Sequence, residues 1–312
     1  MAGTPISRVA IVGLGALGIM YGHFLARAIG QKNVFFVCNE ERVNRYKGAE
    51  VTFNGEPCPF VYATSDAAPF KPDLVIFAVK GNDLEEAVRM TLPLIEEDTV
   101  IISVLNGISS EETIGRIADR GLILPCIAQK MDAKKDGFSV ISGKFGELCF
   151  GAPAEAGDAL KDADVRLKTF FDSIAMPYEA ADDIEHKLWC KWMLNVGVNQ
   201  VMTVGNAVFA DVHKEGALRS RMLGAMREVQ ALSKAVGGVV EITEKDFTDW
   251  VAIIDSLNPA GMPSMRQDRL AKRPSEVEFF SGTVIAKGRE YGVATPINDA
   301  LYREIKAIEA DY

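Results

Sequence analysis

Hydrophobic residues follow two different patterns along the chain, and the pattern changes near residue 182. In the first part, near-continuous apolar runs at 9–12, 33–38, 73–80 and 98–107 predict strands. Runs of this kind are typical of parallel strands that are buried on both faces. The sequence therefore predicts a parallel sheet in the first part of the chain.

Helical spacing of apolar residues fills much of the chain between these strands. The first helix follows the strand at 9–12 and ends near Gly30. The other expected elements are helices at 82–91 and 110–118, a strand at 121–128, a hairpin at 137–152, a helix near 158–173 and a short closing segment at 176–180. Alternation of strands and helices indicates an α/β domain.

Beyond residue 182 the strand-like pattern almost disappears. Helices are expected at 183–204, 214–236, 243–257, 275–291 and 297–310, with an irregular link at 257–265. The length of 312 residues exceeds the usual size of one domain, about 100–150 residues. We therefore expect an α/β domain at 1–181 and an all-α C-terminal domain at 182–312.

Three glycines lie between the first strand and the first helix in the spacing G-x-G-x-x-G. The first permits the tight turn, the second lets the backbone approach a pyrophosphate, and the third lets the helix pack against the strand. The N-terminus of the helix then offers N–H groups and a positive dipole to the phosphates. The motif predicts a Rossmann-type dinucleotide-binding domain whose turn consists of Gly13, Leu14, Gly15, Ala16, Leu17 and Gly18.

The residues after the second strand decide which dinucleotide binds, and here they indicate both. Glu40 or Glu41 could accept a hydrogen bond from a ribose 2′-hydroxyl and would favour NAD. Arg42, Arg45 and Lys47 could pair with a 2′-phosphate and would favour NADP. The residues alone leave both cofactors open.

Composition and charge narrow the possible partners. Hydrophobic residues make up 48% of the chain and no run approaches about 18 apolar residues, so a membrane span is not expected. The net charge is −9 and the basic residues are scattered, which argues against nucleic acid binding. Five dispersed cysteines without a C-x-x-C pair argue against a disulfide framework and a metal site, and the start of the chain lacks a signal leader. A cytoplasmic location is expected.

Hydride transfer to a carbonyl group needs a proton donor at the forming alkoxide. Among the three histidines, His23 falls inside the first helix and His213 in a probable loop, so a histidine donor is poorly supported. Tyr302 and Lys306 form Y-x-x-x-K, but they lie close to the C-terminus rather than after a central strand. Lysine remains the best candidate for the proton donor.

Four polar residues recur at four-residue spacing in an otherwise apolar helix, namely Lys187, Lys191, Asn195 and Asn199. Each four-residue step drifts by only about 40°, so Lys191, Asn195 and Asn199 share one polar seam along the helix. The solvated face of an amphipathic helix would explain the lysines, but asparagine is a mediocre helix former. In an interdomain cleft, Lys191 could donate to a carbonyl oxygen while the two carboxamides hold polar groups of a substrate.

The segment 263–292 also contains candidate residues with structural alternatives. Ser275 and Glu278 fit a capping box, and Glu276 would complement the dipole of the first helical turn. Ser264 could be an ordinary helix cap. These residues alone do not decide between structure and function.

In combination, these motifs resemble the ketopantoate reductases (2-dehydropantoate 2-reductases) over nearly the whole chain. The matching segments are "VGLGALG" at the start, "FAVKGND" around Lys80, "LNG" at 105–107, "LWCKWMLNVGVNQ" at 188–200 and "SMRQDRLAKRPSEVEFFSG" at 264–282. The resemblance implies a Rossmann domain followed by a helical domain. It also implies NADPH-dependent reduction of a 2-keto acid to pantoate on the route to coenzyme A.

The resemblance assigns roles residue by residue. Lys191 would be the general acid, and Glu276 its partner near the nicotinamide ribose. Asn195, Asn199 and Ser264 would hold the substrate, while Lys80 and Asn106 would line the cofactor side of the cleft.

Three departures from the family's usual pattern concern specificity. Asn39 stands where the family commonly has an arginine for the 2′-phosphate, so a preference for NADPH rests on Arg42 or a neighbour, and NADH stays possible. The usual asparagine-proline pair becomes Asn199-Gln200, and an asparagine shortly before the serine is replaced around Gly261. Either of the last two changes could alter which keto acid fits.

Other functions remain open on the same residues. The chain could be a related NAD(P)-dependent reductase of another 2-keto acid or an opine-type dehydrogenase, and its partner would then be a small-molecule acid. A dinucleotide-sensing regulator would keep the glycine turn but needs no lysine and carboxylate opposite it. A homodimer is possible on either view.

Overall fold

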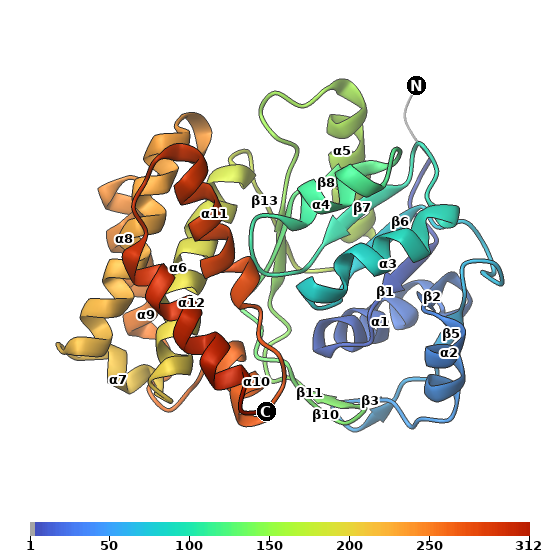
Figure 1. Cartoon of the computed structure of the whole chain (residues 1–312). Coiled ribbons are helices and arrows are strands. Elements are labelled where there is room, and N and C mark those ends of the chain that lie inside the picture. Colours follow the sequence, from blue (N-terminus) through green and yellow to red (C-terminus); the bar gives the residue numbers. More distant parts are fainter. Residues whose placement is uncertain (1–3) are drawn as a thin grey trace. The chain divides into compact units, whose positions relative to one another are not determined.

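The computed structural model describes residues 4–312, which form two compact units (Figure 1). The first unit contains the chain up to Leu105 together with Ser109–Ile184. The second contains Glu185–Tyr312 and the short segment Asn106–Ile108. A three-residue piece of the N-terminal half of the sequence is therefore part of the C-terminal unit.

Six parallel strands form the central sheet of the first unit. All of the apolar runs predicted as strands contribute to it, and one further strand, β5, has no counterpart in the prediction. In spatial order the strands are β5 (Val61–Ala63), β2 (Val34–Val37), β1 (Val9–Val12), β6 (Leu74–Phe77), β7 (Val100–Ser103) and β8 (Leu122–Leu124).

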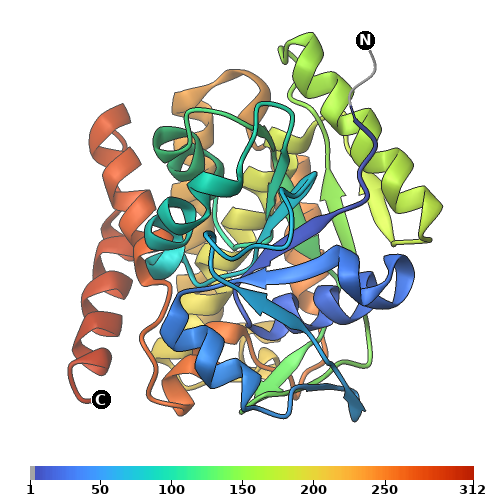
Figure 2. The same cartoon turned by 90° about the vertical axis from the view of Figure 1, so that its right-hand side faces the viewer.

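Helices cover both faces of this sheet (Figure 2). Neighbouring residues of a strand point to opposite faces, so Ile11 packs in one core cluster with Phe171 while Ala10 packs in another with Val88. This two-sided core confirms the predicted α/β fold. The helices of the unit are α1 (Ala16–Ile29), α2 (Glu40–Lys47), α3 (Leu84–Thr91), α4 (Ser110–Ile117) and α5 (Asp158–Ser173).

The segment predicted as a hairpin at 137–152 is divided between two small sheets, so this prediction is wrong. β11 pairs with β10 and β3, whereas β12 pairs with β9 and β13. The chain changes partners at Gly146, where a Cβ would lie 2.3 Å from the Gln129 carbonyl oxygen. The strands are β3 (Thr52–Phe53), β4 (Glu56–Pro57), β9 (Cys126–Gln129), β10 (Lys134–Asp136), β11 (Ser139–Ile141), β12 (Glu147–Phe150) and β13 (Tyr178–Ala180).

The single strand predicted at 121–128 is also divided, because Pro125 stands in its middle. Proline has no N–H to donate to a neighbouring strand. The part before it is β8 of the large sheet, and the part after it is β9 of a small sheet.

The second unit is built from helices around a single apolar core, which confirms the all-α prediction. Trp192 of the first helix is fully buried in this core together with Met226, Val284 and Leu301 of three other helices. The helices are α6 (Ile184–Val204), α7 (Phe209–His213), α8 (Ala217–Val236), α9 (Glu244–Ser256), α10 (Ser264–Leu270), α11 (Ser281–Tyr291) and α12 (Pro296–Glu309).

The helix predicted at 275–291 is shorter in the structure, because α11 begins only at Ser281. A short 3-10 turn at Val277–Phe279 precedes it, and Phe280, with φ −105° and ψ −96°, separates the turn from the helix. The predicted start is wrong because the apolar residues of 277–280 serve this turn rather than a continuous helix.

The predicted capping box between Ser275 and Glu278 does not form. The Ser275 hydroxyl instead accepts a hydrogen bond from the Val277 N–H at 3.3 Å. Glu278 accepts one from the Tyr302 hydroxyl at 2.7 Å and lies 3.6 Å from the Lys306 ammonium. The Y-x-x-x-K pair therefore shares a structural carboxylate.

Two short helices lie where the sequence predicts irregular chain. His213 is the last residue of α7 rather than a loop residue. Ser264 begins α10, but Pro263 is the cap residue and no side chain caps this helix, so Ser264 is not an ordinary cap. Both helices are too short for a helical pattern to emerge from their sequence.

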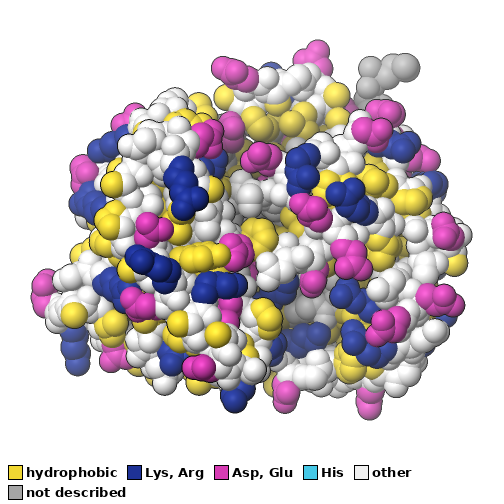
Figure 3. Space-filling view, in the orientation of Figure 1, with side chains coloured by type: hydrophobic (Ala, Val, Ile, Leu, Met, Phe, Trp, Pro, Cys, Tyr) yellow, Lys and Arg dark blue, Asp and Glu magenta, His cyan; other side chains and the backbone are white. Residues whose placement is uncertain are grey.

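On the face in Figure 3, basic and acidic side chains are interspersed. None of the helices in the described part of the chain combines the length and the apolar character that a membrane crossing requires.

Candidate functional site

The glycine turn has the geometry that its spacing predicts. Gly13 has φ 111°, and a Cβ there would lie 2.5 Å from the Ala78 carbonyl oxygen. A Cβ on Gly18 would lie 2.0 Å from the Gly13 carbonyl oxygen. At both positions the packing of the protein itself excludes a side chain.

The second glycine of the motif, Gly15, has an ordinary backbone conformation and is the cap residue of α1. No side chain caps this helix, and its first turn holds no acidic residue. An uncapped helix start next to a glycine turn is suited to a diphosphate. The turn therefore fits the pyrophosphate of a dinucleotide.

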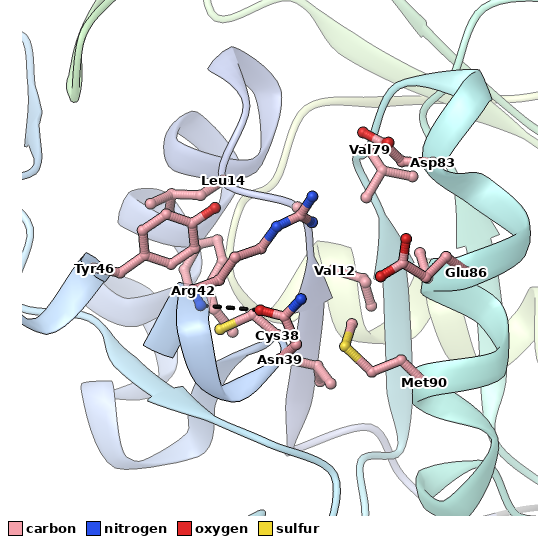
Figure 4. Close-up of a pocket in the computed structure, with 14 residues that line it drawn as sticks. Val12, Leu14, Cys38, Asn39, Arg42, Tyr46, Val79, Asp83, Glu86 and Met90 are labelled. Carbon is pink, nitrogen blue, oxygen red and sulfur yellow. Dashed lines mark hydrogen bonds between the residues drawn. The ribbon is translucent and has the colours of Figure 1, made fainter. Parts of the chain in front are cut away.

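A pocket opens beside this turn, at the carboxyl ends of β1, β2 and β6 (Figure 4). The chain runs from β1 to β2 on one side and later returns to β6 on the other, so β1 marks the switch point of the sheet. Parallel α/β sheets bind their ligands at this point. The lining residues are Val12, Gly13, Leu14, Phe36, Val37, Cys38, Asn39, Arg42, Tyr46, Val79, Asp83, Glu86, Ala87 and Met90.

Asn39 and Arg42 form the wall of the pocket that follows β2. Asn39 caps α2 by accepting a hydrogen bond from the Arg42 N–H at 2.9 Å, and the Arg42 side chain extends into the pocket (Figure 4). Glu40 and Glu41 are exposed and are not lining residues. The carboxylates that would favour NAD are therefore outside the pocket wall, and a cation is inside it.

Three cations lie close enough to this wall to act on the Cys38 thiol. Burial raises the pKa of the Cys38 thiol to about 11, and the cations Arg42, Arg45 and Lys47 oppose this shift. Arg45 also donates to the Tyr46 hydroxyl at 3.2 Å. On the opposite wall lie two carboxylates, those of Asp83 and Glu86 (Figure 4).

Two more lysines belong to this region. Lys80 is exposed and caps the 3-10 turn Gly81–Asp83, directly after the lining residue Val79. Lys135 of β10 donates a hydrogen bond to the Leu14 carbonyl oxygen of the glycine turn. The sequence does not predict Lys135 as a site residue, because nothing in its local pattern connects β10 to that turn.

The polar seam of α6 forms a linked set of side chains in the second unit. The Asn199 carboxamide nitrogen donates to the Asn195 oxygen at 3.2 Å, and the Asn195 nitrogen lies 3.5 Å from the Asn106 oxygen. The Asn199 oxygen accepts from the Met265 N–H at 3.3 Å and lies 3.4 Å from the Ser264 hydroxyl. We call Asn106, Asn195, Asn199 and Ser264 the carboxamide cluster.

Lys191 lies one turn before this cluster on α6 and is half-buried. The next residue, Trp192, donates its indole N–H to the Phe279 carbonyl oxygen at 3.0 Å. The buried residue Glu276 belongs to the same turn, since its carbonyl oxygen accepts from the Phe279 N–H. The turn that carries Glu276 therefore packs against Trp192, the residue that follows Lys191 in the sequence.

The segment Asn106–Ile108 completes this region. Gly107 has φ 105°, and a Cβ there would lie 3.6 Å from the Phe279 carbonyl oxygen. Three segments that are far apart in the sequence, at 106–108, 191–199 and 264–279, are thus brought together within the second unit.

Gln200 differs from its neighbour Asn199 in the direction of its contacts. Its side chain is fully buried and accepts from the Ser281 N–H at 3.1 Å, while it donates to the Asn298 oxygen at 3.2 Å. The residue therefore connects α6 to α11 and α12. Gly261 is also structural, since its carbonyl oxygen accepts from the Phe209 N–H.

His23 and His213, the histidines considered as proton donors, lie in environments unlike that of Lys191. His23 contacts Cys58 and Glu56, and burial lowers its pKa against the opposing effect of Glu56. His213 lies 2.9 Å from the Ile254 carbonyl oxygen. Neither contacts the carboxamide cluster.

Comparison of the chain with known proteins identifies its family. The family model described as "Ketopantoate reductase PanE/ApbA" matches residues 9–155, and its C-terminal counterpart matches residues 183–309. A 2-dehydropantoate 2-reductase of Aquifex aeolicus is 27% identical over 310 residues, which cover 97% of each chain.

Solved structures agree in fold. A PanE/ApbA family ketopantoate reductase from Ralstonia eutropha aligns with a TM-score of 0.82 at 22% identity, covering 97% of this chain and 99% of that one. A D-mandelate dehydrogenase solved with NADH and anilino(oxo)acetate aligns with a TM-score of 0.84 at 23% identity and the same coverage. The two family models together span most of the described residues, and the chain belongs to the ketopantoate reductase family of NAD(P)H-dependent oxidoreductases.

Proposed function

We propose that this protein reduces ketopantoate to pantoate with NADPH. The observation that supports this most is the carboxamide cluster beside Lys191 in the second unit. Neutral amide donors can hold an anionic keto acid, and an ammonium group can protonate the oxygen that its reduction creates. We assign cofactor binding to the domain 1–181 and substrate binding to the domain 182–312.

In this proposal the first unit holds the cofactor through the turn Gly13–Gly18 and through Arg42. The uncapped start of α1 would receive the pyrophosphate. Arg42 would pair with the 2′-phosphate that distinguishes NADPH, while Asn39 next to it brings no negative charge that would repel the phosphate. Lys80 and Asn106 would line the cofactor side of the site.

When bound, the nicotinamide supplies a hydride to the keto carbon. The residues of this chain orient the substrate and move the proton: Lys191 donates it to the developing alkoxide, and Glu276 holds the ammonium in place. Asn195, Asn199 and Ser264 bind the polar groups of the acid. Because Asn199 is itself fixed by the Met265 N–H, its carboxamide is oriented before the substrate arrives.

A second candidate is the reduction of another 2-keto acid. The likeness to a D-mandelate dehydrogenase, which was solved with NADH and a 2-oxo acid amide, favours this candidate. An opine-type reaction is a further alternative, and a regulator that only senses dinucleotides would show no turnover. A panel of aliphatic and aromatic keto acids, scored by kcat/KM with NADPH and NADH, separates these functions.

The decisive experiment replaces the proposed proton donor. Lys191→Ala should lower kcat by about 100-fold or more, since general acids contribute about that much. Lys187→Ala is the matched control, because Lys187 is also half-buried and lies one turn earlier on α6. It should keep kcat within about threefold. Near-normal turnover of Lys191→Ala would remove Lys191 from this role.

The oligomeric state and the cellular location remain predictions. A homodimer is possible, and light scattering at several concentrations measures it directly. A cytoplasmic location agrees with the five cysteines, none of which forms a disulfide within residues 4–312.

A further inference from the structure

Three side chains of the second unit bring different metal-binding atoms close together. His186 and Cys190 lie one turn apart on α6, and Asp246 lies in the first turn of α9. The imidazole nitrogen, the sulfur and a carboxylate oxygen all lie within 4.8 Å of one another. The proposed reaction uses none of the three.

Two of the three distances between these atoms agree with those around a tetrahedral zinc ion. The Cys190 Sγ lies 3.4 Å from the His186 Nε2, and the Asp246 Oδ1 lies 3.4 Å from the same nitrogen. Zinc binds nitrogen and oxygen at about 2.0–2.2 Å and sulfur at about 2.3 Å, so its tetrahedral ligands lie roughly 3.3–3.6 Å apart. Both distances fall in that interval.

A second cluster in the first unit shows that this convergence is not a general property of histidine contacts. The Cys58 Sγ also lies 3.4 Å from a histidine nitrogen, the His23 Nδ1. The nearby carboxylate, however, faces the other ring nitrogen: the Glu56 Oε2 lies 3.4 Å from the His23 Nε2. The two ring nitrogens point in different directions, so one ion could not bind all three groups.

The rest of the Asp246 carboxylate is already held in place. Its Oδ2 accepts hydrogen bonds from the Thr243 N–H at 2.8 Å and from the Thr243 hydroxyl at 2.5 Å, as part of the capping box of α9. Hydrogen bonds of this kind orient a ligand before the metal arrives. The other oxygen, Oδ1, is the one that faces His186.

We propose that His186, Cys190 and Asp246 form a zinc-binding site that connects α6 to α9. Cys190 would bind as a thiolate and release its proton to water, and the neutral imidazole and the carboxylate would complete a three-ligand set. The side chains of His186 and Asp246 are 22% and 25% exposed, so water can occupy the fourth position. The sequence did not predict this metal site, because H-x-x-x-C is not one of the cysteine-pair patterns that are typical of zinc sites.

The test is a cobalt titration of the full chain after removal of metal by a chelator. Cobalt substitutes for zinc, and a bound thiolate gives it a sulfur-to-cobalt charge-transfer absorption. We expect this band to saturate at one ion per chain. His186→Asn and Cys190→Ser should each lose the band and weaken binding by at least about tenfold, since even supporting residues of a metal site contribute that much.

Cys58→Ser is the matched control, because it removes a thiol at the same distance from a histidine. It should keep the full band. His186 is partly exposed, so His186→Asn should leave the far-ultraviolet circular dichroism spectrum unchanged. Absence of the band in the unmodified chain, or its persistence in both His186→Asn and Cys190→Ser, would overturn the proposal.

Discussion

The preference for NADPH depends, in our proposal, on the single cation that enters the pocket wall after β2. Arg42→Gln keeps the length and polarity of the side chain but removes its charge. The Asn39 cap of α2 is made to the backbone N–H of residue 42, so the substitution leaves it intact. The variant should therefore change cofactor binding without unfolding α2.

The size of the effect follows from the kind of contact that is lost. A hydrogen bond to a charged group contributes about 1.5–3 kcal/mol, and each 1.4 kcal/mol corresponds to about a factor of ten. The KM for NADPH should therefore rise roughly 10- to 150-fold. The KM for NADH should change by less than about threefold, because NADH has no phosphate at the 2′ position.

The assay follows the absorbance of each reduced cofactor at saturating keto acid. Arg45→Gln is the matched control, because Arg45 lies on the same helix, donates to the Tyr46 hydroxyl and does not line the pocket. It should raise the KM for NADPH by less than about threefold. An equal rise in KM for NADPH and NADH in Arg42→Gln would refute the role of Arg42 in selecting the phosphate.

Two further predictions concern the framework of the first unit. Gly18→Ala should destabilise the protein by about 1–3 kcal/mol and weaken NADPH binding in a cofactor titration, because its Cβ would lie 2.0 Å from the Gly13 carbonyl oxygen. Gly157→Ala, whose Cβ meets no atom within 4 Å, should leave NADPH binding unchanged. Burial alone would raise the pKa of Asp73, but hydrogen bonds from Arg8 and Ser7 outweigh it and lower the pKa below its usual value. A carboxylate whose pKa is lower in the folded than in the unfolded state stabilises the fold fully at pH values above its unfolded-state pKa. This stabilisation is lost as the pH falls through its folded-state pKa. Urea unfolding should therefore show Asp73→Asn less stable than the unmodified protein at pH 7 and nearly equal to it near pH 2; a constant difference at both pH values would contradict this sign.

The sheet was predictable because its strands are buried on both faces and so read as apolar runs. The helix α2 was not, although it shapes the cofactor pocket. Only Val43 and Tyr46 of its residues are buried, and two apolar positions are too few to establish a helical period. The strand β5 was not predictable either, because it has only three residues.

The candidate site was predictable where it depends on local sequence and not where it depends on tertiary pairing. The glycine turn is contiguous, and Asn195 and Asn199 lie one turn apart on a single helix, so their spacing is visible in the chain. Lys135 lies 121 residues from its partner Leu14. Asp246 lies on a different helix from His186, and no periodicity relates two positions on separate helices.

The direction of the hydrogen bonds in the carboxamide cluster explains why amides rather than carboxylates suit this site. The Asn199 oxygen is occupied by the Met265 N–H, so Asn199 must donate through its nitrogen to Asn195. Asn195 in turn directs its nitrogen to the Asn106 oxygen. Each amide thus fixes the next, and the last of the three, Asn106, accepts through its oxygen and keeps its amide nitrogen as a neutral donor. A carboxylate anywhere in this series would reverse a donor into an acceptor and place a negative charge beside the acidic substrate that we propose.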